Sequence, residues 1–156
     1  MSKAVWWGAG IFVIILLAAF GYWTISPFFI KVQLNEELPT SSSAPQPQDT
    51  PQSGEAAPAQ VVGTAGHPAS GTARVVVAEG KTYIRYENFS TLNGPDIFVY
   101  LSKDLEAKEF VNLGAVKATE GNINYEVPAS VTIADYPYVL TWCRTFSVLF
   151  NYAKVL

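Results

Sequence analysis

The chain has very little sulfur and only one imidazole: of its 156 residues, one is cysteine, one is histidine and one is methionine. A single cysteine, Cys143, cannot form an intramolecular disulfide, so no disulfide framework stabilises the fold. The same count excludes a Cys-x-x-Cys redox pair, c-type haem attachment and an iron–sulfur cluster held by this chain alone. A blue-copper site needs two histidines beside a cysteine, and His67 has no second histidine to join it.

Excess charge of one sign is also missing from the larger part of the chain. From Val61 to Leu156 the sequence has eight Lys or Arg residues and nine Asp or Glu residues. Because binding to phosphate backbones requires a basic stripe, no nucleic acid partner is expected. Catalytic motifs are missing as well: Ser70 near His67 has no nucleophile-elbow context, and no phosphate loop occurs. The sequence therefore favours a protein that is not an enzyme.

What the chain does have is a long apolar segment near its start. No charge occurs between Lys3 and Lys31, so residues 4–30 are uncharged throughout. As a helix this segment would be about 40 Å long, against a hydrocarbon core of about 30 Å. The segment predicts a single membrane-spanning helix with the lipid bilayer as its partner. A cleaved signal peptide is the alternative, but the apolar run is longer than such signals usually have. The short tail before the helix favours a cytoplasmic N-terminus, which would place the C-terminal domain outside the cytoplasm at the cell membrane.

The remaining chain divides into a tether and a domain. Residues 31–60 are expected to be a juxtamembrane segment followed by a disordered linker rich in Pro, Ser and Gln, which cannot bury enough apolar surface to fold. Residues 61–156 form the predicted domain, which contains short segments with period-two alternation separated by Gly, Pro and Asn turns. This pattern predicts an all-β domain, either a small β-sandwich or a barrel. The expected strands are Ala73–Ala78, Thr82–Phe89, Asp96–Ser102, Phe110–Leu113, Ile123–Val127, Tyr138–Cys143 and Ser147–Lys154.

The stretch Tyr138–Tyr152 holds the cysteine between two strand-like runs. Alternation in the first run places Cys143 and Trp142 on opposite faces. Alternation in the second run places four residues on one face: Phe146, Val148, Phe150 and Tyr152. Cys143 is therefore expected in the core or at its edge, where a cysteine most often packs as a small apolar side chain. The alternatives are a redox thiol or cofactor ligand, and an intermolecular disulfide.

The order of landmarks along this domain resembles a known family. Ser70-Gly71-Thr72-Ala73-Arg74 is followed by Gly94-Pro95-Asp96-Ile97-Phe98-Val99-Tyr100-Leu101, then Leu113-Gly114, Tyr125-Glu126-Val127-Pro128 and Val139-Leu140-Thr141-Trp142-Cys143-Arg144-Thr145-Phe146-Ser147-Val148. This order is similar to that of the DM-thirteen domain, the electron-transfer domain that accompanies DOMON domains in Skeletor-type animal proteins. Similar prokaryotic copies follow a membrane anchor. The resemblance implies an extracytoplasmic β domain in which Cys143 acts as a redox thiol or cofactor ligand, with a separate redox protein as electron partner.

The candidate site residues follow from these observations. Cys143 is the candidate redox thiol or cofactor ligand, and His67 is a second candidate cofactor ligand if its loop folds back beside Cys143; an exposed loop histidine is the favoured interpretation. Gly94, Pro95 and Asp96 form a turn in which Asp96 is expected to accept backbone N–H bonds, and Trp142 completes the motif. No metal site is predicted, and the cofactor is left open: haem is a candidate without an attachment motif. The alternative function is a cell-surface binding or adhesion module in which Cys143 is structural.

Overall fold

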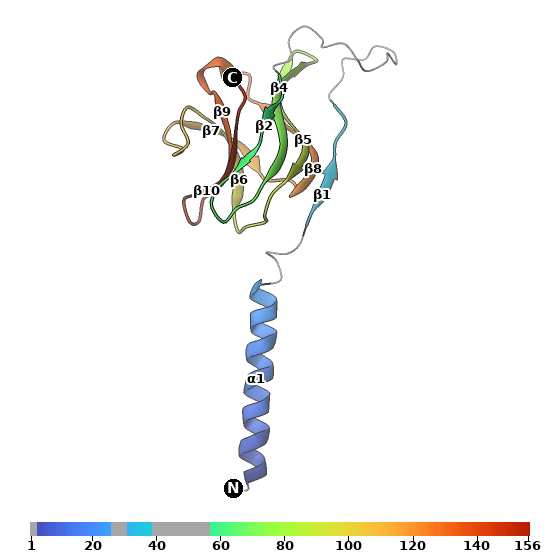
Figure 1. Ribbon diagram of the computed structural model, residues 1–156, viewed down its shortest axis with the longest axis vertical. Coiled ribbons are helices and arrows are strands. Elements are labelled where there is room, and N and C mark those ends of the chain that lie inside the picture. Colours follow the sequence, from blue (N-terminus) through green and yellow to red (C-terminus); the bar gives the residue numbers. More distant parts are fainter. Residues whose placement is uncertain (1–2, 26–30, 39–56) are drawn as a thin grey trace. The chain divides into compact units, whose positions relative to one another are not determined.

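The computed structural model describes residues 3–25, 31–38 and 57–156. The chain divides into two units, residues 1–30 and residues 31–156. The described part of the first unit is helix α1 (Lys3–Ile25) (Figure 1). Among the described residues, no helix has both the length and the apolar character needed to cross a membrane. The predicted membrane-spanning helix over residues 4–30 is therefore not supported by the structure, and residues 26–30 lie outside the described residues.

The second unit is built from two five-stranded sheets (Figure 1). The first sheet has the order β1-β8-β5-β4-β2, and the second has the order β3-β10-β9-β6-β7. The strands of the first sheet are β1 (Gln33–Asn35), β8 (Glu120–Val127), β5 (Lys81–Ser90), β4 (Ser70–Ala78) and β2 (Ala59–Gln60). Those of the second sheet are β3 (Val62–Gly63), β10 (Val148–Lys154), β9 (Tyr138–Cys143), β6 (Ile97–Ser102) and β7 (Phe110–Ala115). A short 3-10 helix, η2 (Ile133–Asp135), precedes β9.

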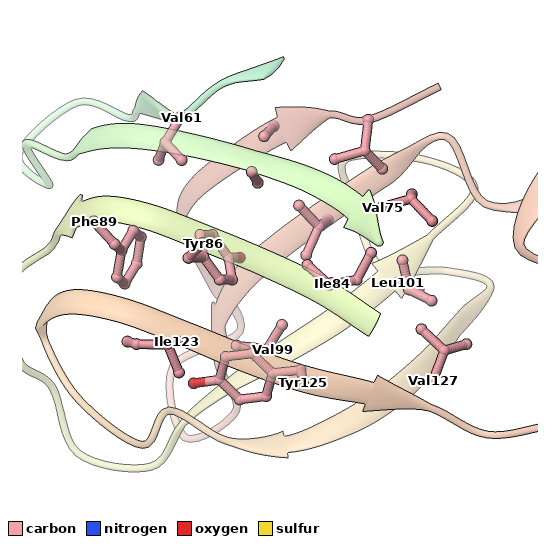
Figure 2. Close-up of a cluster of buried hydrophobic side chains, with 14 of the residues drawn as sticks. Val61, Val75, Ile84, Tyr86, Phe89, Val99, Leu101, Ile123, Tyr125 and Val127 are labelled. Atoms are coloured by element: carbon pink, nitrogen blue, oxygen red, sulfur yellow. The ribbon is translucent and has the colours of Figure 1, made fainter. Parts of the chain in front are cut away.

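The main hydrophobic core lies between the two sheets and draws side chains from both. Ile84 of β5, Ile123 of β8 and Leu101 of β6 belong to this core and are fully buried (Figure 2). Val139 of β9 belongs to the same core and is also fully buried. Burying one such side chain contributes roughly 1.5–3 kcal/mol. Because the inner faces of two separate sheets share this core, the domain is a β-sandwich, which settles the sequence-based choice between sandwich and barrel.

All seven strands predicted from the sequence are present, and three further strands are not predicted. The additional strands β1, β2 and β3 are two or three residues long. A segment of that length contains too few residues to show period-two alternation. Residues 31–38, grouped with the tether in the sequence analysis, thus contribute β1 to the first sheet. Residues 39–56 of the predicted linker lie outside the described residues.

The predicted face of the last strand is wrong because β10 contains a bulge. Leu149 pairs with Trp142, but the next pair joins Asn151 to Thr141, so Phe150 is the extra residue. A bulge interrupts the alternation of side chains. As a result, Asn151 is fully buried beyond the bulge. Phe146 lies before β10, is 66% exposed and does not belong to the predicted face.

Candidate functional site

Cys143 is the last residue of β9 and lies between two neighbouring strands. Its Cα partners are Ile97 of β6 and Val148 of β10. The side chain is fully buried in a small apolar cluster with Ile97 and Phe150, against which Val116 and Val148 are partly buried. We call this group the cysteine cluster. The sequence-based prediction that Cys143 lies in or at the edge of the core is confirmed.

The turn before β6 covers the thiol. The Cys143 Sγ donates a hydrogen bond to the Pro95 carbonyl oxygen, 3.3 Å away. Gly94 lies against the Phe150 ring, and a Cβ atom there would be 2.9 Å from Phe150 Cζ. Two residues of the Gly94-Pro95-Asp96 motif therefore serve the cysteine cluster directly: Gly94 leaves room for the aromatic ring, and Pro95 supplies the acceptor for the thiol.

Asp96 and Arg144 hold this turn in place from outside. Arg144 Nη2 and Nε donate to the two carboxylate oxygens of Asp96 at 2.7 and 3.1 Å, and the Arg144 backbone N–H donates to the Asp96 carbonyl at 3.1 Å. The guanidinium also lies 3.7 Å from the centre of the Phe98 ring. Both charged side chains remain partly exposed, 47% for Arg144 and 37% for Asp96. We call this pair the latch, because it joins the covering turn to the residue next to Cys143.

The latch shifts the pKa values of its two charged groups in opposite directions. Hydrogen bonding from Arg144 lowers the pKa of Asp96, against a smaller opposing effect of desolvation. Hydrogen bonding to Asp96 raises the pKa of Arg144. The guanidinium is thus engaged by a carboxylate. The Asp96 carboxylate binds Arg144 rather than the backbone N–H groups expected from the sequence, and Asn93 Oδ1 accepts the Gly94 N–H at 2.9 Å instead.

His67 folds back onto the cysteine cluster. Its ring stacks on Phe150 with 4.0 Å between ring centres and 28° between planes. Thr64 positions this loop: its N–H donates to the Phe150 carbonyl at 3.0 Å, and its own carbonyl accepts the His67 N–H at 2.9 Å. His67 is half-buried rather than the exposed loop residue favoured by the sequence analysis. His67 contacts the cysteine cluster by stacking on the Phe150 ring.

Trp142 lies on the other face of the sheet from Cys143, as predicted. Its Cα partners are Phe98 of β6 and Leu149 of β10. The side chain is half-buried. The structure therefore separates Trp142 from the thiol and brings together His67, the Gly94-Pro95-Asp96 turn and Cys143.

Two residues of this region, Thr64 and Arg144, were not assigned a role from the sequence, and the contact of Thr64 with Phe150 was not predicted. Arg144 and Asp96 are 48 residues apart, and Thr64 is 86 residues from Phe150. Contacts over such separations leave no periodic signal in a single sequence. The only available indication was the position of Arg144 directly after the cysteine.

The residues around Cys143 do not fit a metal ion or haem. The side chains of the cysteine cluster are apolar, and the thiol is engaged with a backbone carbonyl. Among the described residues, no group of three or more His, Cys, Asp or Glu side chains is arranged to hold a metal ion. Zinc and haem iron need further ligands or an open position that this packing does not provide.

Fold and site together define a small β-sandwich domain that buries a single thiol beneath a latched turn. Comparison with known families shows where this domain belongs. The Electron transfer DM13 family matches residues 61–155, so the chain belongs to that family. Comparisons with curated proteins and with solved structures find no match.

Proposed function

We propose that the domain is an electron-transfer accessory domain in which Cys143 is the redox group and a separate protein is the electron partner. The observation that carries the proposal is the match to an electron-transfer family over residues 61–155. Two geometric features support it. The only thiol lies beneath a turn, and the side-chain contact that joins this turn to the residue after Cys143 is a partly exposed ion pair.

The chemistry available to one thiol is thiol–disulfide exchange. When the turn opens, the Cys143 thiol loses its proton to solvent, and the thiolate attacks one sulfur of a disulfide on the partner. The new S–S bond forms as the partner disulfide breaks, and the second partner sulfur leaves as a thiolate that takes up a proton. This step oxidises the Cys143 sulfur and reduces the released partner sulfur. Two thiols of a separate reductant complete the transfer: the first attacks the Cys143 sulfur and releases the partner as a dithiol, and the second attacks the first reductant sulfur, so that the reductant leaves as a disulfide and the Cys143 thiol is restored.

The proposal includes attachment of the domain to a lipid bilayer through residues 4–30, on the extracytoplasmic side. The support for this attachment is the sequence alone, which has no charged residue between Lys3 and Lys31. Membranes from expressing cells, washed with alkaline carbonate, test the attachment. Retention of the full chain and release of a variant lacking residues 4–30 are expected. Release of both chains would contradict the anchor.

A second candidate function, a surface binding module with a structural cysteine, is favoured by one observation. Cys143 is fully buried, and its thiol already has an acceptor. A buried cysteine packs as a small apolar side chain and is inert. The two functions differ in whether the thiol reacts while the domain is folded.

Trapping with oxidised glutathione separates the two candidates. The full chain is incubated without denaturant, and intact mass reports whether one glutathione is added; Cys143→Ala is the control that removes the only thiol. We expect addition to the native chain and none to the control. A native chain that gains glutathione only after denaturation would replace the redox proposal by the binding module.

An optical spectrum before and after dithionite tests the haem alternative on the same sample. We expect no Soret band in the natively purified chain. A Soret band that shifts on reduction and disappears in Cys143→Ala would replace the thiol mechanism by haem ligation.

A further inference from the structure

Strand β1 fills the outer edge of the first sheet and comes from outside the family match. It pairs in parallel with β8, with Gln33 opposite Glu120 and Asn35 opposite Asn122 (Figure 1). The family match begins at residue 61, so β1 is an addition to the matched domain. An edge strand presents unpaired N–H and C=O groups that accept another strand. In this chain a segment preceding the matched domain binds to that edge.

Backbone contacts fix the register of the segment. The Val32 carbonyl accepts the N–H groups of Thr119 and Glu120 at 2.9 and 3.0 Å, and the Val32 N–H donates to Thr119 Oγ1 at 2.9 Å. At the other end, the Glu36 N–H donates to the Asn122 carbonyl at 2.8 Å. These contacts bind any extended backbone and carry no side-chain preference.

Preference comes from the way Glu36 is bound. One carboxylate oxygen accepts the Asn124 N–H at 2.6 Å, and the other accepts Lys117 Nζ at 3.0 Å. The Glu36 backbone carbonyl accepts a hydrogen bond from Arg85 Nη1 at 2.8 Å, and the Glu37 backbone carbonyl accepts one from Asn124 Nδ2 at 2.8 Å. Arg85 is only 6% exposed, so a buried cation faces this segment. Charge-assisted hydrogen bonds to a carboxylate are stronger than neutral ones.

Two further features of this edge favour the bound segment: an apolar contact with the core and a glycine where the two backbones approach closely. Leu34 packs partly buried against the main core, two residues before Glu36 and on the same side of the strand. Gly121 of β8 has no side chain at the point of closest approach: a Cβ there would lie 2.0 Å from the Leu34 carbonyl oxygen. Lys31 adds an ion pair with Glu120. The edge thus has an apolar contact for Leu34, a carboxylate site for Glu36 and a glycine that lets the bound backbone approach closely.

We propose that this edge is a peptide-binding site for an extended segment that carries an apolar residue followed two positions later by glutamate. Its occupant is the chain's own segment Lys31–Glu37, bound by strand addition. Lys117 and the Asn124 N–H determine the preference for glutamate, and Arg85 and Gly121 hold the backbone of the bound segment. This binding site is independent of the chemistry of Cys143.

Two glycines provide a matched test of strand binding. Gly121 and Gly114 both have φ of +119°, but a Cβ at Gly114 meets no atom within 4 Å. Both Gly121→Ala and Gly114→Ala therefore add backbone strain, and only Gly121→Ala blocks β1. Hydrogen exchange in the full chain is expected to speed up at Thr119, Glu120 and Glu36 in Gly121→Ala but not in Gly114→Ala. Equal exchange at these amides in the two variants would overturn the proposal.

A synthetic peptide of residues 31–38 tests the site in trans. The full chain with Leu34→Asp and Glu36→Lys releases its own strand, and we expect the fluorescent peptide to bind this double variant at least ten times more tightly than the unaltered chain. A peptide carrying the same two changes is the control and should not bind. Failure of the unaltered peptide to bind the double variant would overturn the proposal, as would equal binding to the unaltered chain.

Discussion

The two buried regions of the domain differ in what closes them. The main core has side chains from both sheets, with fully buried residues such as Ile84, Leu101 and Val139 at its centre. The cysteine cluster has three buried residues, one each from β6, β9 and β10, and the thiol is covered by the turn at Pro95, which the partly exposed latch holds. A surface ion pair stabilises a structure far less than a buried apolar side chain does. Complete burial of the thiol is therefore compatible with access through local opening.

This difference matters because proteins open locally at a lower free energy than they unfold globally. The main core must come apart only in global unfolding. The cover of Cys143 opens when the Asp96–Arg144 pair separates and the Pro95 carbonyl moves away. The comparison therefore predicts changes that affect one region without the other.

The largest effect is expected from truncation in the main core. Leu101→Ala removes a fully buried side chain and should lower the free energy of unfolding by about 2–5 kcal/mol. Urea denaturation followed by tryptophan fluorescence measures this loss. Lys103→Ala, at the exposed position directly after β6, is the control and should leave the midpoint nearly unchanged. A loss below about 1 kcal/mol for Leu101→Ala would show that the core is not where the stability lies.

The second largest effect is expected at alkaline pH, which should lower the free energy of unfolding through the main core. Burial raises the pKa of Tyr125 to about 12 and raises that of Tyr86 further. Because the folded pKa exceeds the unfolded value of about 10, the stabilisation is complete below about pH 10 and is lost as pH rises through about 12. Urea midpoints measured from neutral pH upward should fall steeply in that window. An unchanged midpoint across it would contradict the burial of these two hydroxyls.

Breaking the latch should affect the cysteine cluster and leave the main core intact. Asp96→Asn removes the charge, and asparagine tolerates the φ of +63° at this position. We expect native thiol labelling of Cys143 to become several times faster with an unchanged urea midpoint. Glu109→Gln breaks the exposed Lys103–Glu109 pair at the other end of β6 and is the matched control. Equal labelling rates in both variants would show that the latch does not control access.

Low pH should also speed up the native labelling of Cys143, but less than Asp96→Asn does. The pKa of Asp96 is lowered by its hydrogen bonds from Arg144. Because the folded value lies below the unfolded one, the latch contributes fully above about pH 4 and is lost as pH falls through the lowered pKa. A dipyridyl disulfide labels thiols in acid, so the ratio of native to denatured labelling rates can be followed down to about pH 3. The ratio should rise there in the unaltered chain and stay flat in Asp96→Asn.

The parts of this fold with a short-range signal could be predicted from the sequence. Alternation found the seven longer strands and placed Cys143 and Trp142 on opposite faces, because side-chain direction in a strand follows a period of two. The faces of the last strand were predicted wrongly because the bulge at Phe150 interrupts the alternation, and the sequence pattern did not indicate a bulge there. The latch and β1 were missed because their partners are 48 and 87 residues away, and a single sequence does not show such pairs.

The dependence of Cys143 labelling on urea tests most directly whether the thiol is reached by local opening. The native full chain is labelled at increasing urea concentrations below the unfolding transition. Local opening exposes little surface, so the labelling rate should be nearly independent of urea at first and join the steep global-unfolding line only near the midpoint. A rate that follows the global line at every concentration would mean that Cys143 is exposed only when the whole domain unfolds, and would contradict a redox role in the folded protein.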